Sequence, residues 1–216
     1  MTREFRQEDV LELWFPETGH ERDNDSHSEF WTERMQGGMD ERICARFGGL
    51  TEAAARGCLD HWADTPYGRL ALLIALDQFP RSVWRDTPGA FAQDIKATRL
   101  ALEGIENGHY AALDHAWEKQ FYLIAMTHCE GPDHLSRCDK VIAMSKDLAA
   151  NDVPPQLDRF KELSVAQAER VRGVIARFGR HPHRNPILGR LSTPEEEAYI
   201  AEGDFPHLRR PEVETS

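Results

Sequence analysis

The chain has few positively charged side chains for its size. Its 216 residues include 26 Lys and Arg against 37 Asp and Glu, which gives a formal net charge of −11. Nucleic acids and anionic membrane surfaces both need clustered cations on the protein that binds them. We therefore expect neither nucleic acid nor a membrane among the partners.

Long hydrophobic runs and paired cysteines are also missing. No stretch of about 20 apolar residues could form a membrane span, and residues 1–15 contain no apolar core of a secretory signal. The four cysteines, Cys44, Cys58, Cys129 and Cys138, form no Cys-x-x-Cys pair and no zinc-binding spacing. The sequence therefore predicts a cytoplasmic protein with reduced, unpaired thiols.

Motifs of established catalytic sites are absent as well. The sequence has no Gly-x-Ser-x-Gly, no phosphate-binding loop, no His-Glu-x-x-His and no dinucleotide fingerprint. No reaction is therefore predicted from a motif, and we expect no cofactor and no metal. The sequence leaves both enzymatic activity and oligomeric state open.

Alternation between apolar and polar residues, which is typical of strands, is not found over any useful length. Apolar residues instead recur at helical spacings of three and four, and Gly or Pro separates the segments. This pattern predicts an all-α protein whose longest helix ends at Phe178-Gly179. We expect one all-α domain over residues 1–205 and a flexible tail over residues 206–216.

Three local patterns add detail to this prediction. Thr87-Pro88 and Thr193-Pro194 each predict a helix start, with Thr as N-cap and Pro in the first helical position. Three glutamates follow the second pair, and the positive N-terminal end of the helix dipole would stabilise their carboxylates. The polar segment from Glu17 to Ser28 predicts a solvated loop.

The most apolar segment, residues 70–76, is hydrophobic on every side of a helix and predicts a helix surrounded by other helices. Asp77, Gln78 and Arg81 follow it. Because Pro80 cannot continue a helix and disfavours helical backbone before it, we expect the buried helix to end here. Asp77 would act as a general base if burial raised its pKa, and a structural Asp77–Arg81 pair is the alternative.

Residues 177–190 are positively charged in a chain of negative net charge, because they contain four arginines and no acidic residue. The polar residues of interest there are Arg177, Arg180, His183, Arg184, Asn185 and Arg190. Glycines and prolines predict an ordered loop after the helix. Since the guanidinium fork binds carboxylate or phosphate at two points, the cluster predicts a site for a small anionic molecule. Each arginine could instead hold a helix end or pair with a buried carboxylate.

His128 and Glu130 form a third polar group, at the predicted end of a helix before Gly131-Pro132. Side chains two residues apart diverge on a helix, so a metal site would need further ligands such as Asp77, His181 or His183. A histidine at a helix C-terminus is also favoured by the helix dipole alone. We expect four further histidines, His61, His109, His115 and His134, on the surface.

The sequence resembles a bacterial family catalogued as domain of unknown function 924. The resemblance rests on LDQFPR at residues 76–81, RFGRHPHRN at residues 177–185, LGR at residues 188–190 and STPEE at residues 192–196, and it spans nearly the whole chain. It implies antiparallel helix pairs stacked as a tetratricopeptide-like superhelix, and it implies no established reaction. The chain departs from the family pattern at Val171 and Gly173, where His and Asp are usual, and at His181, where Phe is usual.

Three functions therefore compete. The first is a pocket for a small anionic ligand, in which Asp77, His128, Glu130 and His183 would be catalytic and Gln78, Arg81, Arg177, Arg180, Arg184, Asn185 and Arg190 would bind the ligand. The second is a scaffold whose concave helical groove binds a carboxylate-bearing peptide. The third is a purely structural role for all these residues. The first hypothesis requires the three polar groups to share one water-accessible hollow.

Overall fold

The computed structural model describes residues 5–206, which form helices and turns without any strand. The α-helices are α1 Gln7–Trp14, α2 Asn24–Met35, α3 Asp40–Ala55, α4 Pro66–Leu73, α5 Pro80–Val83, α6 Asp94–Glu106, α7 Ala116–His128, α8 His134–Asn151, α9 Asp158–Phe178, α10 Asn185–Leu188 and α11 Pro194–Glu202. The predicted all-α class is confirmed. No helix among the described residues is long and apolar enough to cross a membrane.

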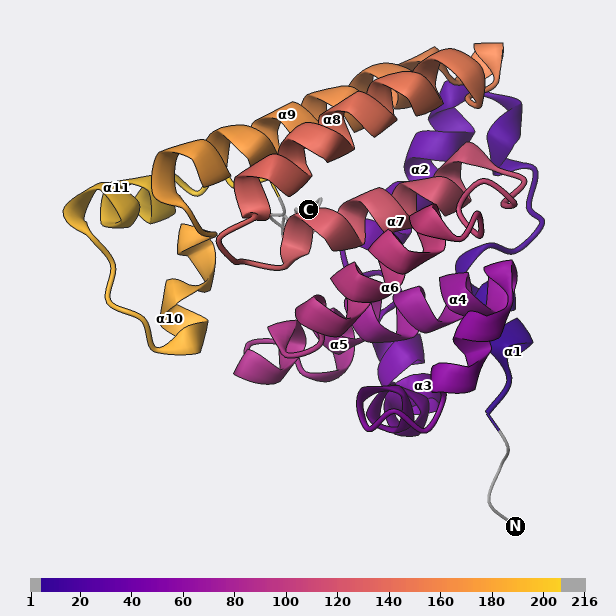
Figure 1. Cartoon of the computed structure of the whole chain (residues 1–216), viewed down its shortest axis with the longest axis horizontal. Coiled ribbons are helices and arrows are strands. Elements are labelled where there is room, and N and C mark those ends of the chain that lie inside the picture. The colour runs from indigo at the N-terminus through magenta and orange to yellow at the C-terminus, as the bar shows by residue number, and fades with distance from the viewer. Residues whose placement is uncertain (1–4, 207–216) are drawn as a thin grey trace, which may run out of the picture.

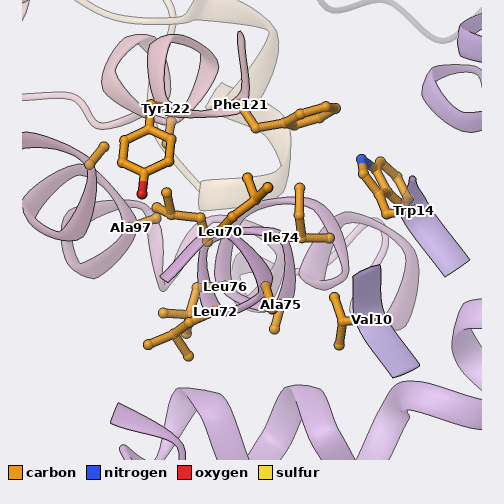
Figure 2. Packing of buried hydrophobic residues seen from close by; sticks show 14 of the residues in the cluster. Val10, Trp14, Leu70, Leu72, Ile74, Ala75, Leu76, Ala97, Phe121 and Tyr122 are labelled. Carbon is orange, nitrogen blue, oxygen red and sulfur yellow. The ribbon is translucent and has the colours of Figure 1, made fainter. Parts of the chain in front are cut away.

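The central element is α4 together with the π-helical turn Ile74–Gln78 that follows it. Every side chain from Leu70 to Leu76 is at most 1% exposed, which confirms the predicted buried helix. Side chains of α1, α6 and α7 surround this segment in Figure 2, and α3 contacts the π turn. Burial on all sides explains why no polar residue interrupts the segment.

The buried helical segment ends at Gln78, before Pro80 as predicted, but the non-helical backbone expected at Phe79 is wrong. Phe79 keeps helical backbone angles (φ −63°, ψ −37°), and its N–H donates to the carbonyl oxygen of Ile74 at 3.1 Å. This bond reaches back five residues, so the turn contains one residue more than an α-turn. Pro80 then begins α5 at a position where its missing N–H is not needed. α5 thus follows the π turn without an extended residue between them, and Asp77 and Gln78 lie on the widened turn.

The second half of the chain forms a long antiparallel pair, in which α8 and α9 lie side by side along one edge of the molecule (Figure 1). α9 ends as predicted at Phe178, and Gly179 follows with a left-handed φ of 69°. α7 lies beneath this pair, and α2 contacts α9 near its first turns. α10 and α11 close the end of the pair that lies far from α2.

The two Thr-Pro predictions have different outcomes. Thr193 caps α11, because its hydroxyl accepts from the N–H of Glu196 at 3.2 Å and the Glu196 carboxylate accepts from the N–H of Thr193 at 2.8 Å. Thr87 is not such a cap, since its hydroxyl donates to the Trp84 carbonyl at 2.7 Å and a 3₁₀ turn follows. α6 begins only at Asp94.

The segment expected as a solvated loop is partly buried. A 3₁₀ turn at residues 20–22 and the start of α2 bring His20 and His27 to 6% and 3% exposure. The sequence showed mainly polar neighbours there, whereas the two imidazoles pack among aromatic rings. Of the expected tail, only Pro206 belongs to the described residues. The domain boundary and the regular tetratricopeptide-like stack stay predictions.

We expect the buried segment to dominate stability. Replacing Leu72, which is 0% exposed, by Ala should lower the free energy of unfolding by about 2–5 kcal/mol, because the deleted methyl groups leave a cavity. Leu191→Ala is the control, since that side chain is 93% exposed and should cost less than about 0.5 kcal/mol. Urea denaturation followed by circular dichroism measures both. Equal losses in the two variants would contradict the placement of this segment.

Candidate functional site

The π turn meets the C-terminal end of α7 in a buried polar contact. His128 Nδ1 donates to Asp77 Oδ1 at 2.7 Å, and Gln78 Nε2 donates to Asp77 Oδ2 at 2.5 Å. All three residues are at most 4% exposed. Burial and the nearby Arg81 guanidinium lower the pKa of His128 well below its ordinary value, so its imidazole is neutral at pH 7.

Asp94 joins this contact to the arginine-rich segment. Its Oδ1 accepts from Arg81 Nη2 at 3.0 Å, and its Oδ2 accepts from Arg184 Nη1 at 2.9 Å. Arg81 also lies 3.5 Å from Asp77 Oδ1, and the Arg184 guanidinium lies 4.4 Å from the centre of the Phe91 ring. The two arginines and the two aspartates therefore balance each other in a buried four-charge cluster, which we call the ion-pair cluster.

Glu130 holds a neighbouring set of contacts. Its carboxylate accepts from the His181 N–H at 2.8 Å and forms an ion pair with Arg190. Arg190 Nε donates in turn to Asn185 Oδ1 at 3.0 Å. Although burial raises the pKa of Glu130, the hydrogen bonds from Arg190 and His181 lower it overall, so the carboxylate is charged.

Arg177 and Arg180 contact α11 instead of the ion-pair cluster. Arg180 forms a two-point contact with Glu196, with N–O distances of 2.6 and 2.8 Å, and Arg177 Nε lies 2.7 Å from Glu195 Oε1. The Arg180 guanidinium therefore makes the two-point contact that was predicted for an anionic ligand with the Glu196 carboxylate of the same chain. These two residues fix α11 against the end of α9.

His183 is half-buried beside the ion-pair cluster. Its ring stacks on Phe205 with ring centres 5.2 Å apart, and it lies 5.5 Å from the His181 ring. Burial and the charge of Arg184 lower the pKa of His183 to about 3. It is therefore neutral at pH 7, like His128.

The C-terminal end of α7 is held by side chains that the sequence did not single out. Arg137 donates to the carbonyl oxygens of Met126 and Cys129 at 2.5 and 2.7 Å. His134 Nε2 and His181 Nε2 both donate to the Thr127 carbonyl oxygen, at 2.8 and 3.1 Å. The prediction of a surface position for His134 is wrong, because this side chain is 0% exposed. These bonds satisfy the last carbonyl groups of the helix.

The three predicted polar groups come together around Asp94, but as a buried, ion-paired contact and not around the shared water-accessible hollow that the first hypothesis required, since only His128 of these described residues lines a cavity. Asp77, Gln78, Arg81, His128 and Arg184 meet there, and Glu130, Asn185 and Arg190 lie in the adjoining set. Asp94 itself was missed, although it precedes the buried residues Ala97 and Ala101 on one face of α6. The helical spacing of Asp94 with Ala97 and Ala101 is the signal that could have indicated a buried Asp94.

A cavity of about 340 Å³ opens between α2, α7, α8 and α9, and His128 and Thr127 form part of its wall. Four large aromatic residues, Trp31, Trp117, Phe121 and Phe160, line it with several aliphatic side chains. None of its described lining residues is Asp, Glu, Lys or Arg, although these types make up 29% of the chain. The hollow adjoining the ion-pair cluster is therefore uncharged, and neutral polar side chains such as Gln36, Gln120 and Gln167 share its wall with the apolar ones.

Three polar atoms of residues that line the cavity have no hydrogen-bond partner among the described residues, and they are buried beneath the wall and do not face the open hollow. They are Trp31 Nε1, Gln120 Oε1 and His27 Nε2. The other nitrogen of His27, Nδ1, lies 3.0 Å from His20 Nδ1. Burial and His20 lower the pKa of His27 to about 4, and burial lowers the pKa of His20, so both rings are neutral and one of them donates its Nδ1 proton to the other. Unsatisfied buried polar atoms are uncommon in folded proteins and call for an explanation.

No group of His, Cys, Asp and Glu side chains suited to a metal ion occurs among residues 5–206. All four cysteines are unpaired, which confirms the sequence prediction. Burial raises the pKa of the Cys138 thiol to about 11, so this thiol is not a reactive nucleophile at pH 7.

Breaking the ion-pair cluster should destabilise the protein strongly. Asp94→Asn removes the charge that two buried guanidiniums share, and we expect a loss of about 3–5 kcal/mol in the free energy of unfolding. The control Glu195→Gln removes an exposed partner of Arg177 and should cost at most about 1 kcal/mol. Chemical denaturation measures both variants. An Asp94→Asn protein as stable as the control would show that the cluster does not hold the fold.

Stability should fall as the pH is lowered from about 7 to about 5. The pKa of His27 is about 4 in the folded chain and has its ordinary value of 6.5 in the unfolded chain, so only the unfolded chain takes up a proton in this range. One such histidine contributes a slope of up to about 1.4 kcal/mol per pH unit. His27→Phe keeps the ring packing and should reduce the slope by that amount. Identical slopes in the two proteins would contradict a neutral, buried His27.

Comparison with known proteins places the chain in a family. The structure of ATU0120, a protein of unknown function from Agrobacterium tumefaciens, has a TM-score of 0.71 and 30% sequence identity, and the match covers 91% of this chain and 97% of that one. No curated protein matches the chain. A family model described as bacterial protein of unknown function (DUF924) matches residues 10–204. The chain therefore belongs to this bacterial family of unknown function, DUF924.

Proposed function

We propose that the protein binds a small molecule in the cavity between α2, α7, α8 and α9. The observation that carries this proposal is a hollow of about 340 Å³, lined by aromatic and aliphatic side chains together with neutral polar ones. Small-molecule sites have this volume and this mixture of apolar surface with a few polar groups. A core packed only for stability would fill such a space.

The ion-pair cluster contacts one residue of the cavity wall, His128. His128 connects the two, because its Nδ1 donates to Asp77 of the cluster while the residue lines the hollow. Asp77, Gln78 and Asp94 therefore act as positioning residues that fix the ring of His128 and the end of α7. A ligand in the cavity would contact His128 and Thr127, and the arginines would not touch it.

The earlier hypothesis of a small anionic ligand at the arginine-rich segment stays a prediction. Each arginine proposed for it already contacts a carboxylate of the same chain, as Arg184 does with Asp94 and Arg180 with Glu196. A bound anion would have to displace one of these carboxylates, which exchanges one ion pair for another. We therefore favour the cavity over the arginines as the binding site.

A thermal-shift screen of small metabolites tests the proposal. Ala168 lines the cavity from α9 and is 5% exposed, so Ala168→Phe should fill the hollow and abolish stabilisation by any ligand found. Ala176→Phe is the matched control, because this residue is exposed on the same helix. We expect hits that raise the melting temperature of the native protein and of Ala176→Phe, and leave Ala168→Phe unchanged.

Two results would contradict the proposal. One is a ligand that stabilises Ala168→Phe as strongly as the native protein, since it would bind elsewhere. The other is the absence of any small-molecule hit together with stoichiometric capture of one polypeptide, which would favour the peptide scaffold. Quenching of tryptophan fluorescence gives an independent measure, because Trp31 and Trp117 both line the hollow.

A further inference from the structure

We propose that the C-terminal segment of this chain, residues 207–216, docks along α9 over the cavity and places Leu208 against Leu163. The docked segment covers the hollow and competes with any molecule that enters it. This inference goes beyond the proposed function, because it rests on the cavity and on the course of the chain before residue 207, and it needs no small-molecule ligand.

The chain that leads to this segment runs along α9 in the opposite direction. α11 begins beside the C-terminal end of α9, where the ion pairs of its first glutamates lie (Figure 1). Further along, Arg170 Nη2 donates to the carbonyl oxygen of Asp204 at 3.0 Å, and Gln167 Nε2 donates to the carbonyl oxygen of Pro206. Each step forward in the C-terminal chain is therefore a step back toward the start of α9.

The side of α9 that holds this chain continues into the cavity wall. Its residues are spaced by seven, three, four and three positions, and they are Arg177, Arg170, Gln167, Leu163 and Phe160. Such spacings bring side chains to one face of an α-helix. The last three of these residues line the hollow. A chain that keeps its course beyond Pro206 therefore meets the cavity.

Leu163 is the next residue on this face, and it is uncovered. Its large apolar side chain is 58% exposed, whereas Pro206 is buried. The four residues from Gln167 back to Leu163 correspond to a rise of about 6 Å, and two residues of extended chain after Pro206 span about 7 Å. Leu208 is therefore the residue that reaches Leu163. Their contact removes apolar surface of both side chains from water.

The cavity wall accepts Leu208 better than the two arginines that follow it. The described lining has no charged residue, so Arg209 or Arg210 would lose its hydration there without an acidic partner. The segment is also long enough to cross the hollow. Its ten residues span at most about 36 Å when extended, and the part of α9 that lines the cavity, residues 160–171, rises by about 16 Å.

Disulfide formation tests the contact directly. Cys44→Ser and Cys58→Ser first remove the two exposed thiols. In this background Leu163→Cys and Leu208→Cys should form an intramolecular disulfide under mild oxidation, because such a bond needs Cα atoms within about 7 Å of each other. The control combines Leu208→Cys with Glu162→Cys, an exposed neighbour that does not line the cavity, and it should stay reduced. Mass spectrometry after proteolysis identifies the bond.

Nile red, a neutral dye that fluoresces in apolar sites, measures access to the hollow in the full chain. Leu208→Asp should bind the dye at least about threefold more tightly than the native protein, because a covered cavity lowers the apparent affinity by the fraction of molecules that are open. The uncharged wall disfavours the new carboxylate, so the segment leaves the hollow. Thr215→Asp is the control of equal charge and should have no effect. Ala168→Phe should abolish dye binding, which locates the dye in the cavity.

The outcomes separate this inference from the proposed function. A disulfide at position 163 but not at 162, together with tighter dye binding by Leu208→Asp, supports the inference even if the metabolite screen finds no ligand, and then the proposed function alone fails. The absence of the disulfide, with equal dye binding by Leu208→Asp and Thr215→Asp, overturns the inference even if a metabolite binds. A disulfide-linked dimer also overturns it, because the segment of a second copy would then occupy the groove.

Discussion

The carboxylate of Asp94 is the contact on which the arrangement of the site depends. It accepts from Arg81 beside the π turn and from Arg184 in the segment before α10, at 3.0 and 2.9 Å. One acidic side chain of α6 thus joins the core helix to the C-terminal part of the chain. Without it, two guanidiniums would remain buried with only Asp77 to balance them, which is a costly state in a low-dielectric interior. The junction adjoins the end of α7 through Asp77, which accepts from His128.

The sequence predicted the polar residues that meet but not the way in which they are satisfied. Hydrophobic periodicity and the Pro80 boundary showed that Asp77, Gln78 and Arg81 follow a buried helix, and the structure places them beside His128. The arginines suggested an external anion because their acidic partners are distant in sequence. Arg184 and Asp94 are 90 residues apart, and local patterns carry no information about such pairs.

Other features could not be predicted because they depend on helix spacing in three dimensions. His20 and His27 lie in a polar segment, so their sequence neighbours indicated a solvated loop, whereas Trp31, Trp117 and Phe160 bury them. The cavity arises because α8 and α9 lie across α2 and α7 without filling the space between them. A helical pattern gives the buried face of each helix, and it gives no distance between two faces.

The π turn at Ile74–Gln78 sets the direction in which the side chains after it point. A turn of this kind holds one surplus residue relative to an α-helix, and each residue of an α-helix rotates the chain by about 100°. Deleting one residue of this turn would therefore swing every later side chain around the axis. The guanidinium of Arg81 would turn away from Asp94 on α6, while the preceding hydrophobic turns kept their packing.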